Sequence, residues 1–139
     1  MWAAMLGPTL LHAGGTEDTT LCMEGVECVM IYISAHWCGP CRALTPKLAS
    51  AYRRQTGNVR VVFVSLDHDQ AQFDEYFQTM PWHAVQYEED RYSVINELSD
   101  LTQTPIKSIP SLLVFSPTGQ LLTSDGCGKF EEYLKPTAG

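Results

Sequence analysis

The sequence predicts an α/β domain in which buried strands alternate with amphipathic helices. Two hydrophobic runs, 28–33 and 59–66, have the length and β-branched content of strands covered on both faces. Between them, residues 38–57 change to helical spacing, and a strand, helix, strand order implies parallel pairing through a right-handed crossover. A length of 139 residues suits one domain, 1–139, whose first and last few residues we expect to be mobile.

The run 28–33, Cys-Val-Met-Ile-Tyr-Ile, is the predicted central strand, because it is continuously apolar. The helix that follows begins at Cys38 and ends near Gly57, and Pro46 in its interior should kink it. Its apolar residues share one face: Leu44, Leu48, Ala51 and Tyr52.

At the N-terminal end, residues 7–11 are predicted to form a short strand, and Gly14-Gly15 marks a turn after it. Residues 19–22 are the predicted partner strand across that turn. This would add a small hairpin to the domain.

Two further helices are predicted from the spacing of apolar residues. The first covers 69–79, with Asp67 or Asp69 available as its N-cap. The second covers 91–103 and should end before Pro105. Its apolar stripe has four members: Tyr92, Ile95, Leu98 and Leu101.

The C-terminal part contains a predicted hairpin, because strand-like runs at 111–115 and 121–123 flank Pro117-Thr118-Gly119. A short final helix is expected over 130–134. The acidic run 88–90 fits either attraction of a basic partner or a solvated turn, and we assign it no function.

Composition excludes several classes of function. A hydrophobic content of 45% and a charged content of 18% are typical of soluble globular proteins. Nine Lys and Arg against 16 Asp and Glu give a formal charge of −7, which argues against nucleic acid and anionic membranes as partners. The apolar runs are strand-sized, far below the roughly 20 residues of a membrane helix. Residues 1–8 lack signal-peptide and transit-peptide features, so we expect a cytoplasmic protein.

The pair Cys38-Gly39-Pro40-Cys41 carries the predicted chemistry. It lies between a hydrophobic strand and a helix, which puts the first sulfur at a helix N-terminus, where free N–H groups favour an anion. Only the thiolate attacks a disulfide, so Cys38 is the predicted nucleophile. Cys41, one turn onward and more buried, would resolve the mixed disulfide and leave a Cys38–Cys41 disulfide. Pro40 suits the first helical turn.

A zinc site is the competing interpretation of this pair, because Cys-x-x-Cys supplies half of such a site. A closed site requires two more ligands with suitable spacing, and the sequence has no second cluster, so we expect no metal. Five cysteines is an odd count that does not suit a secreted disulfide framework. The remaining cysteines and the histidines are too scattered to suggest a metal site: Cys22, Cys28, Cys127, His12, His36, His68 and His83. The three cysteines are interpreted as buried residues with no role in the chemistry.

The residues around this pair resemble the thioredoxin superfamily. The similarity lies in Ala35-His36-Trp37-Cys38-Gly39-Pro40-Cys41-Arg42, in Pro46 and in Ile109-Pro110. Residues 32–38, 44–48 and 108–112, together with Met80-Pro81-Trp82, look more specifically like the tryparedoxin and nucleoredoxin branch, and most like tryparedoxin. The resemblance covers roughly residues 7–125.

The resemblance implies a thioredoxin-like fold: a central twisted, mixed β-sheet flanked by helices, with a cis-proline loop facing the dithiol. Ile109-Pro110 would be that cis bond, and Ile109 would offer backbone groups to an extended substrate segment. Trp37, Gly39 and Pro40 would complete the substrate-binding surface. Met80-Pro81-Trp82 fits either a wall of this surface or a packing cluster, and His36 fits either a neighbour that tunes Cys38 or surface decoration.

One position departs from the branch and another from ordinary thioredoxins. Gly39 stands where members usually carry proline, so the turn resembles ordinary thioredoxin. Tyr32 occupies the position of the buried aspartate of thioredoxins, as in tryparedoxins, which leaves the proton acceptor for Cys41 unassigned. Within a buried run, Tyr32 is interpreted as a core residue.

By this resemblance, the chain is expected to be a protein-disulfide oxidoreductase with no bound cofactor beyond its redox-active disulfide. Peroxiredoxin-type proteins or ribonucleotide reductase are the implied clients, with trypanothione or a thioredoxin reductase as reductant, and a monomer is expected. Two alternatives stay open: a nucleoredoxin-like adaptor that binds a signalling partner, and a thioredoxin reduced by a flavoprotein.

Overall fold

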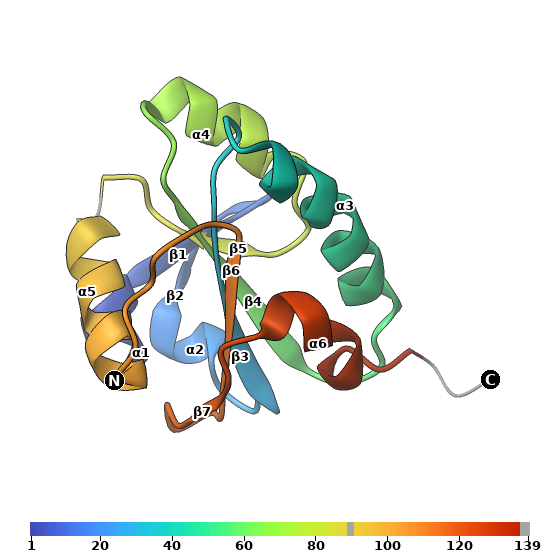
Figure 1. The fold of residues 1–139 in the computed structure, drawn as a ribbon. Coiled ribbons are helices and arrows are strands. Elements are labelled where there is room, and N and C mark those ends of the chain that lie inside the picture. Colours follow the sequence, from blue (N-terminus) through green and yellow to red (C-terminus); the bar gives the residue numbers. More distant parts are fainter. Residues whose placement is uncertain (89–90, 137–139) are drawn as a thin grey trace.

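The computed structural model describes residues 1–88 and 91–136. Glu89 and Asp90 of the acidic run, and the last residues expected to be mobile, 137–139, lie outside the described residues. Within the described ranges, the chain forms one seven-stranded mixed sheet with helices on both faces (Figure 1). The predicted α/β class and mixed sheet are confirmed.

The elements follow one another with short connections. In chain order they are α1 Trp2–Leu6, β1 Thr9–His12, β2 Gly15–Asp18, α2 Thr19–Cys22, β3 Cys28–Ser34, α3 Gly39–Arg54, β4 Val59–Ser65, α4 Gln70–Phe77, β5 His83–Val85, α5 Arg91–Thr102, β6 Ser111–Phe115, β7 Leu121–Thr123 and α6 Gly126–Tyr133.

The sheet has the strand order β2-β1-β5-β4-β3-β6-β7. β3 pairs with β4 in parallel and with β6 in antiparallel orientation, so the predicted central strand is central, and the unit β3-α3-β4 is confirmed. Every residue of β3 is buried, because helices cover both faces of the sheet. The predicted hairpin of β6 and β7 is also confirmed.

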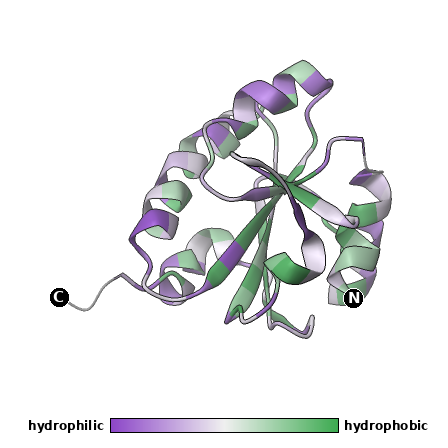
Figure 2. Ribbon diagram, turned by 180° about the vertical axis from the view of Figure 1, so that it is seen from behind, coloured by the Kyte–Doolittle hydropathy of each residue, from purple (hydrophilic) through white to green (hydrophobic). Residues whose placement is uncertain are grey.

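Successive residues of β3 point to opposite faces and thereby divide the core in two. Met30 and Tyr32 face a core completed by residues of α3, α4 and α6. Val29, Ile31 and Ile33 face a second core completed by α1, α2 and α5. Figure 2 shows hydrophobic residues concentrated in the central strands, and hydrophilic residues mainly on helices and loops.

The predicted N-terminal hairpin is correct in its first strand and wrong in its second. The partner of β1 is Gly15–Asp18, and the predicted strand 19–22 is the short helix α2. The local reason is the cap, since the Asp18 side chain accepts a hydrogen bond from the Leu21 N–H at 3.0 Å and thereby starts the helix. The turn is tight because Gly15 has φ of 130°.

Residues 2–6 form helix α1, which packs on the sheet. Trp2 is buried against Phe115, with ring centroids 5.8 Å apart, and its Nε1–H donates to the carbonyl of Pro117 at 2.9 Å. Leu6 is fully buried. The expected mobility of the first few residues stays a prediction, but these contacts join α1 to β6 and to the loop that follows it.

Three other elements differ in detail from what the sequence predicts. Strand β5, which pairs in parallel with β4, was not predicted, because its three residues are too short for a periodic pattern. In α5, Val94 and Leu98 face the core, whereas Tyr92 and Leu101 of the predicted stripe are exposed. The final helix α6 begins at Gly126, before the predicted 130. Across residues 1–88 and 91–136, none of the helices combines the length and apolarity needed to cross a membrane.

Candidate active site

The candidate site lies where β3 ends and α3 begins, at the end of the central strand. Ser34 is the last residue of β3, and a turn closed by the Cys38 N–H and the Ala35 carbonyl at 3.1 Å leads into the helix. Cys38 is the N-cap of α3, and Pro40 lies in its first turn. Proline suits this position because an N–H here would have no helical partner.

The Cys38 sulfur has two backbone neighbours. It accepts a hydrogen bond from the Cys41 N–H at 3.4 Å, and as a thiol it donates to the Ile109 carbonyl at 3.8 Å. Only 7% of the residue is exposed. An amide N–H at a helix N-terminus that points at a sulfur is a favourable partner for a thiolate. The thiolate is the form of cysteine that attacks a disulfide.

The loop before β6 faces Cys38, as the sequence predicts. The Ile109-Pro110 peptide bond is cis, which confirms that prediction. Both residues are half-buried, and the Pro110 carbonyl accepts a contact from the Cys127 thiol of α6 at 3.6 Å. The loop therefore packs between the dithiol and α6.

Cys41 is fully buried beneath Cys38. The pKa of the Cys41 thiol is raised from 9.0 to about 11: burial is the main cause, the contact with Cys38 adds to the rise, and the Ser34 hydroxyl opposes it. A thiol in this environment keeps its proton at neutral pH. In the predicted resolving role it would have to lose that proton, so the groups around it would influence the rate of that step.

Four hydroxyl groups are connected behind Cys41, on residues that the sequence did not assign to the site, and one of them is Tyr32, which was interpreted as a core residue. The Tyr32 and Thr45 hydroxyls lie 3.3 and 2.9 Å from the Cys41 carbonyl oxygen, to which each can donate, and 2.8 Å from each other. Because each hydroxyl has one proton, these three hydrogen bonds alternate rather than form together. Tyr76 bonds to Thr45 at 2.7 Å and to Ser34 at 2.8 Å. Burial raises the pKa values of both tyrosines, so the cluster is neutral.

This hydroxyl cluster of Tyr32, Ser34, Thr45 and Tyr76 reaches a surface cavity. Thr45 and Tyr76 line a hollow of about 280 Å³ together with His36, Arg42, Pro46 and Thr79. The cluster therefore links the buried Cys41 to a site that solvent enters. Ser34 and Thr45 were detectable in principle, because they lie two residues after Tyr32 on the strand and four after Cys41 on the helix. Tyr76 comes close only through the tertiary fold.

A buried carboxylate holds the loop in front of Cys38. Asp67, fully buried after β4, accepts hydrogen bonds from the His36 N–H at 2.8 Å and the Ser65 hydroxyl at 2.6 Å. It is therefore not the helix cap, which is Asp69. The His36 ring packs on Tyr76, with centroids 5.6 Å apart.

The predicted surface residues around the dithiol are exposed. Trp37 is 51% exposed, although its Nε1–H donates to the Leu66 carbonyl at 3.1 Å and its ring lies near His68. Gly39 and Pro40 are exposed beside it. By contrast, Met80 and Trp82 are core residues, which decides for the packing interpretation of that motif.

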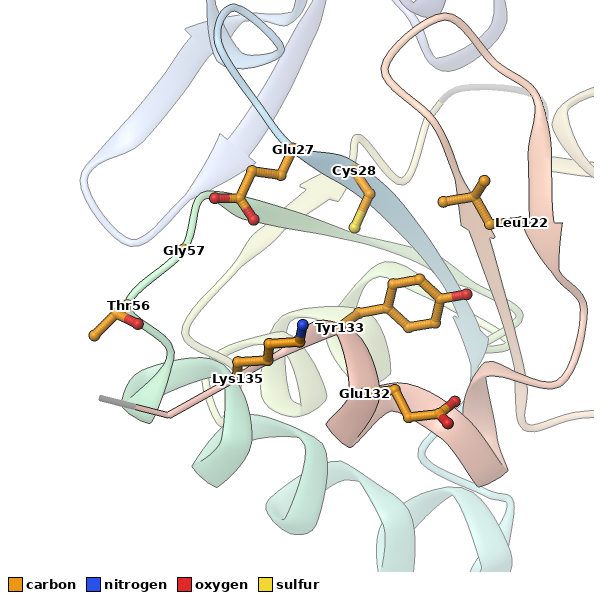
Figure 3. A pocket seen from close by; sticks show the side chains of 8 residues that line it. All are labelled: Glu27, Cys28, Thr56, Gly57, Leu122, Glu132, Tyr133 and Lys135. Atoms are coloured by element: carbon orange, nitrogen blue, oxygen red, sulfur yellow. The ribbon is translucent and has the colours of Figure 1, made fainter. Parts of the chain in front are cut away.

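Cys28 lies at the opposite end of β3 from the dithiol. It lines a pocket of about 410 Å³, which Figure 3 shows with Glu27 and Lys135 among its surrounding side chains. Cys22 and Cys28 are buried, as the sequence predicts, and burial raises the pKa of each to about 11, whereas Cys127 is only half-buried.

Comparison with known proteins agrees with this geometry. The sequence model of a family described as thioredoxin-like matches residues 25–121. Human nucleoredoxin is 37% identical over 143 residues, which cover 94% of this chain and 31% of nucleoredoxin, so the chain spans about a third of that relative. Tryparedoxin from Trypanosoma brucei superposes with a TM-score of 0.80 at 31% identity, covering 94% of this chain and 90% of that one.

A second solved structure, tryparedoxin II in complex with glutathionylspermidine, superposes with a TM-score of 0.77 at 28% identity, covering 90% of this chain and 85% of that one. The predicted thioredoxin-like fold is therefore confirmed. The chain belongs to the thioredoxin-like family, in the branch that holds the nucleoredoxins and tryparedoxins.

Proposed function

We propose that this chain is a protein-disulfide reductase that passes electrons to peroxiredoxin-type and other protein disulfides, in the manner of a tryparedoxin. The observation that carries the proposal is the environment of Cys38. Its sulfur caps α3, accepts the Cys41 N–H, and lies at the surface edge of the dithiol, whereas Cys41 is fully buried. One sulfur is placed to attack a client, and the other only to attack the first.

The reaction exchanges disulfides without a bound cofactor. The Cys38 thiolate attacks one client sulfur, so a Cys38–client disulfide forms and the other client sulfur leaves as a thiolate. Cys41 then loses its proton and attacks Cys38, which forms the Cys38–Cys41 disulfide and releases the second client thiolate. Two electrons pass to the client, and a reductant must return them.

The surface around Cys38 supports an extended client segment. Trp37, Gly39 and Pro40 form one side, and Ile109 and Pro110 the other. The Ile109 carbonyl accepts the Cys38 thiol before the reaction. Once Cys38 is joined to a client, this acceptor is free for a client N–H, a main-chain contact that tolerates many client sequences.

A dithiol such as trypanothione is the proposed reductant. One of the similar tryparedoxins is in complex with glutathionylspermidine, which supports a thiol of this chemistry. The proposal places the protein in a reducing compartment, the cytoplasm, because a free dithiol persists there. It acts as a monomer, since one chain supplies both cysteines.

The first test separates the roles of the two cysteines. Cys41→Ser should accumulate a mixed disulfide with an oxidised peroxiredoxin, whereas Cys38→Ser should neither trap it nor reduce insulin. Cys28→Ser, a buried cysteine at the other end of β3, is the matched control and should keep activity. Turnover by Cys38→Ser would show that Cys38 is not the nucleophile.

The second test identifies the electron donor. The oxidised protein is offered trypanothione, glutathione, or a flavoprotein thioredoxin reductase with its reducing cofactor, and the reduction rates are compared. We expect trypanothione to be fastest. A faster thioredoxin reductase would instead favour the thioredoxin pathway that Gly39 suggests.

A second candidate function is a redox adaptor, supported by the 37% identity to human nucleoredoxin. An adaptor binds its partner through the same surface but turns over slowly. It predicts a stable complex that survives in Cys38→Ser, whereas the reductase predicts a complex that requires Cys38.

A further inference from the structure

Glu17, Cys22 and His83 come together at one end of the sheet, far from the dithiol in sequence. Glu17 lies on β2, Cys22 ends α2, and His83 begins β5. The carboxylate oxygen, the sulfur and the ring nitrogen all lie within 4.8 Å of one another. Glu17 Oε2 is 3.6 Å from His83 Nε2.

His83 is the unusual member of this group. It is only 8% exposed, yet neither ring nitrogen has a hydrogen-bond partner among the described residues. A buried polar atom without a partner costs free energy, so such a group is expected to have a use. Burial lowers the pKa of His83, which keeps the imidazole neutral and its lone pair free to bind a metal.

We propose that Glu17, Cys22 and His83 form a zinc-binding site. A thiolate, an imidazole and a carboxylate are ligands that zinc takes together. Donor atoms on one tetrahedral zinc ion lie roughly 3.3–3.8 Å apart, as follows from bond lengths of about 2.0–2.3 Å. The Glu17–His83 separation of 3.6 Å already has this size, and the other two are at most 4.8 Å, so small side-chain movements suffice to complete the site.

The charges of the ligands balance those of a divalent cation, which allows zinc to bind beside Arg60. The Arg60 Nε–H donates to the Cys22 carbonyl at 3.0 Å, so a positive group lies beside the site. Zinc with one thiolate and one carboxylate is neutral, and the guanidinium therefore meets no net charge when the metal is bound. The proton of Cys22 is released as the sulfur–zinc bond forms.

The site is open to solvent on one side, and the fourth ligand position of the zinc ion has no protein ligand in the described ranges. The Glu17 side chain is 40% exposed, whereas Cys22 is 1% exposed, so the metal enters on the Glu17 side. His12 lies beside His83, with ring centroids 5.4 Å apart, but its Nδ1 accepts the Gly14 N–H. The described residues whose ligand atoms lie within 4.8 Å of one another are Glu17, Cys22 and His83, so we count three protein ligands, with water in the fourth position.

Bound zinc would join three separate elements, β2, α2 and β5, and thereby fasten the N-terminal hairpin to the rest of the sheet. A ligand that binds only the folded state raises the melting temperature. The site is independent of the proposed reductase function, because none of its ligands belongs to the dithiol or to the hydroxyl cluster.

The test uses cobalt(II) as a spectroscopic substitute for zinc, in a Cys38→Ser/Cys41→Ser background that removes the competing dithiol. We expect one cobalt per chain, with a thiolate-to-cobalt charge-transfer band that one equivalent of zinc abolishes. Adding Cys22→Ser should abolish the band, and adding Cys28→Ser should leave it unchanged. Zinc should also raise the melting temperature of the background protein.

Cys22→Ser changes a buried residue and could lose cobalt binding because it fails to fold. Glu17→Gln tests a second ligand without that ambiguity, because the Glu17 side chain is partly exposed. It should fold normally and bind cobalt at least about tenfold more weakly, whereas Glu24→Gln on the surface nearby should bind as the background does. Absence of saturable binding, a band that persists in Cys22→Ser, or equal affinity of the two glutamine variants would each overturn the site.

Discussion

Cys38 and Cys41 are three residues apart and have different surroundings, and this difference supports their proposed roles as attacking and resolving sulfur. Cys38 faces a backbone N–H and the surface loop of Ile109. Cys41 is fully buried, and its raised pKa keeps it protonated at neutral pH. The proposed division of roles therefore depends on burial as much as on the motif.

Ser34 is expected to assist the resolving step. Its hydroxyl lowers the pKa of Cys41, so Ser34→Ala should raise that pKa further and slow resolution roughly two- to tenfold at pH 7. The measurement is the decay of a mixed disulfide preformed on Cys38, followed against pH. The rate profile should move to higher pH, whereas Ser50→Ala, exposed on α3, should keep the profile of the wild type. Identical profiles for both variants would exclude this role.

Trp37 is expected to contribute to client binding rather than to stability. At 51% exposed, it loses little packing on truncation, so Trp37→Ala should leave the free energy of unfolding within about 0.5 kcal/mol. KM for a protein disulfide should rise about fivefold or more, as for an aromatic contact at an interface centre. Leu21→Ala, an exposed apolar residue on α2, is the control. An unchanged KM would contradict the docking role.

At the scale of elements, the N-terminal helix α1 is part of the core. Trp2 packs edge-to-face on Phe115 of β6 and hydrogen-bonds to Pro117. Trp2→Ala should therefore destabilise the protein by about 3–5 kcal/mol in urea denaturation, as for other large-to-small changes in cores. Trp37→Ala makes the matched comparison, since it removes the same atoms from the surface. Equal stability of the two variants would mean that α1 is not held as described.

For the whole molecule, the buried thiols set the stability at alkaline pH. Burial raises the pKa values of Cys22, Cys28 and Cys41 from 9.0 to about 11. Because the unfolded chain ionises first, their contribution is fully present below about pH 9 and is lost as pH rises to about 11.

Denaturant unfolding of the reduced protein with a chelator present should therefore show stability falling between pH 9 and 11. Cys28→Ala should be less stable at pH 7 but lose less stability over this interval, because one of the three thiols with a pKa of about 11 is gone. Equal losses in wild type and variant would exclude the thiols as the cause.

The sequence predicts the long elements correctly, because their signals are local. The continuous apolar run of β3, the helical spacing of α3 and the Pro-Thr-Gly turn of the last hairpin need no distant contact to be recognised. Short elements are different: β5 and α2 have too few residues for a period. For α2, the cap at Asp18 overrode strand-like composition.

By itself, the sequence determines the α/β class and the place of the Cys-x-x-Cys pair between a strand and a helix, since spacing along those two elements places Cys38 and Cys41. Only the tertiary structure decides which polar groups meet Cys41 and which meet His83. Tyr76 and Thr45, or Glu17 and His83, lie on different elements, and their contact depends on strand order and on which face each side chain takes. Those are properties of the packed sheet, and no local pattern records them.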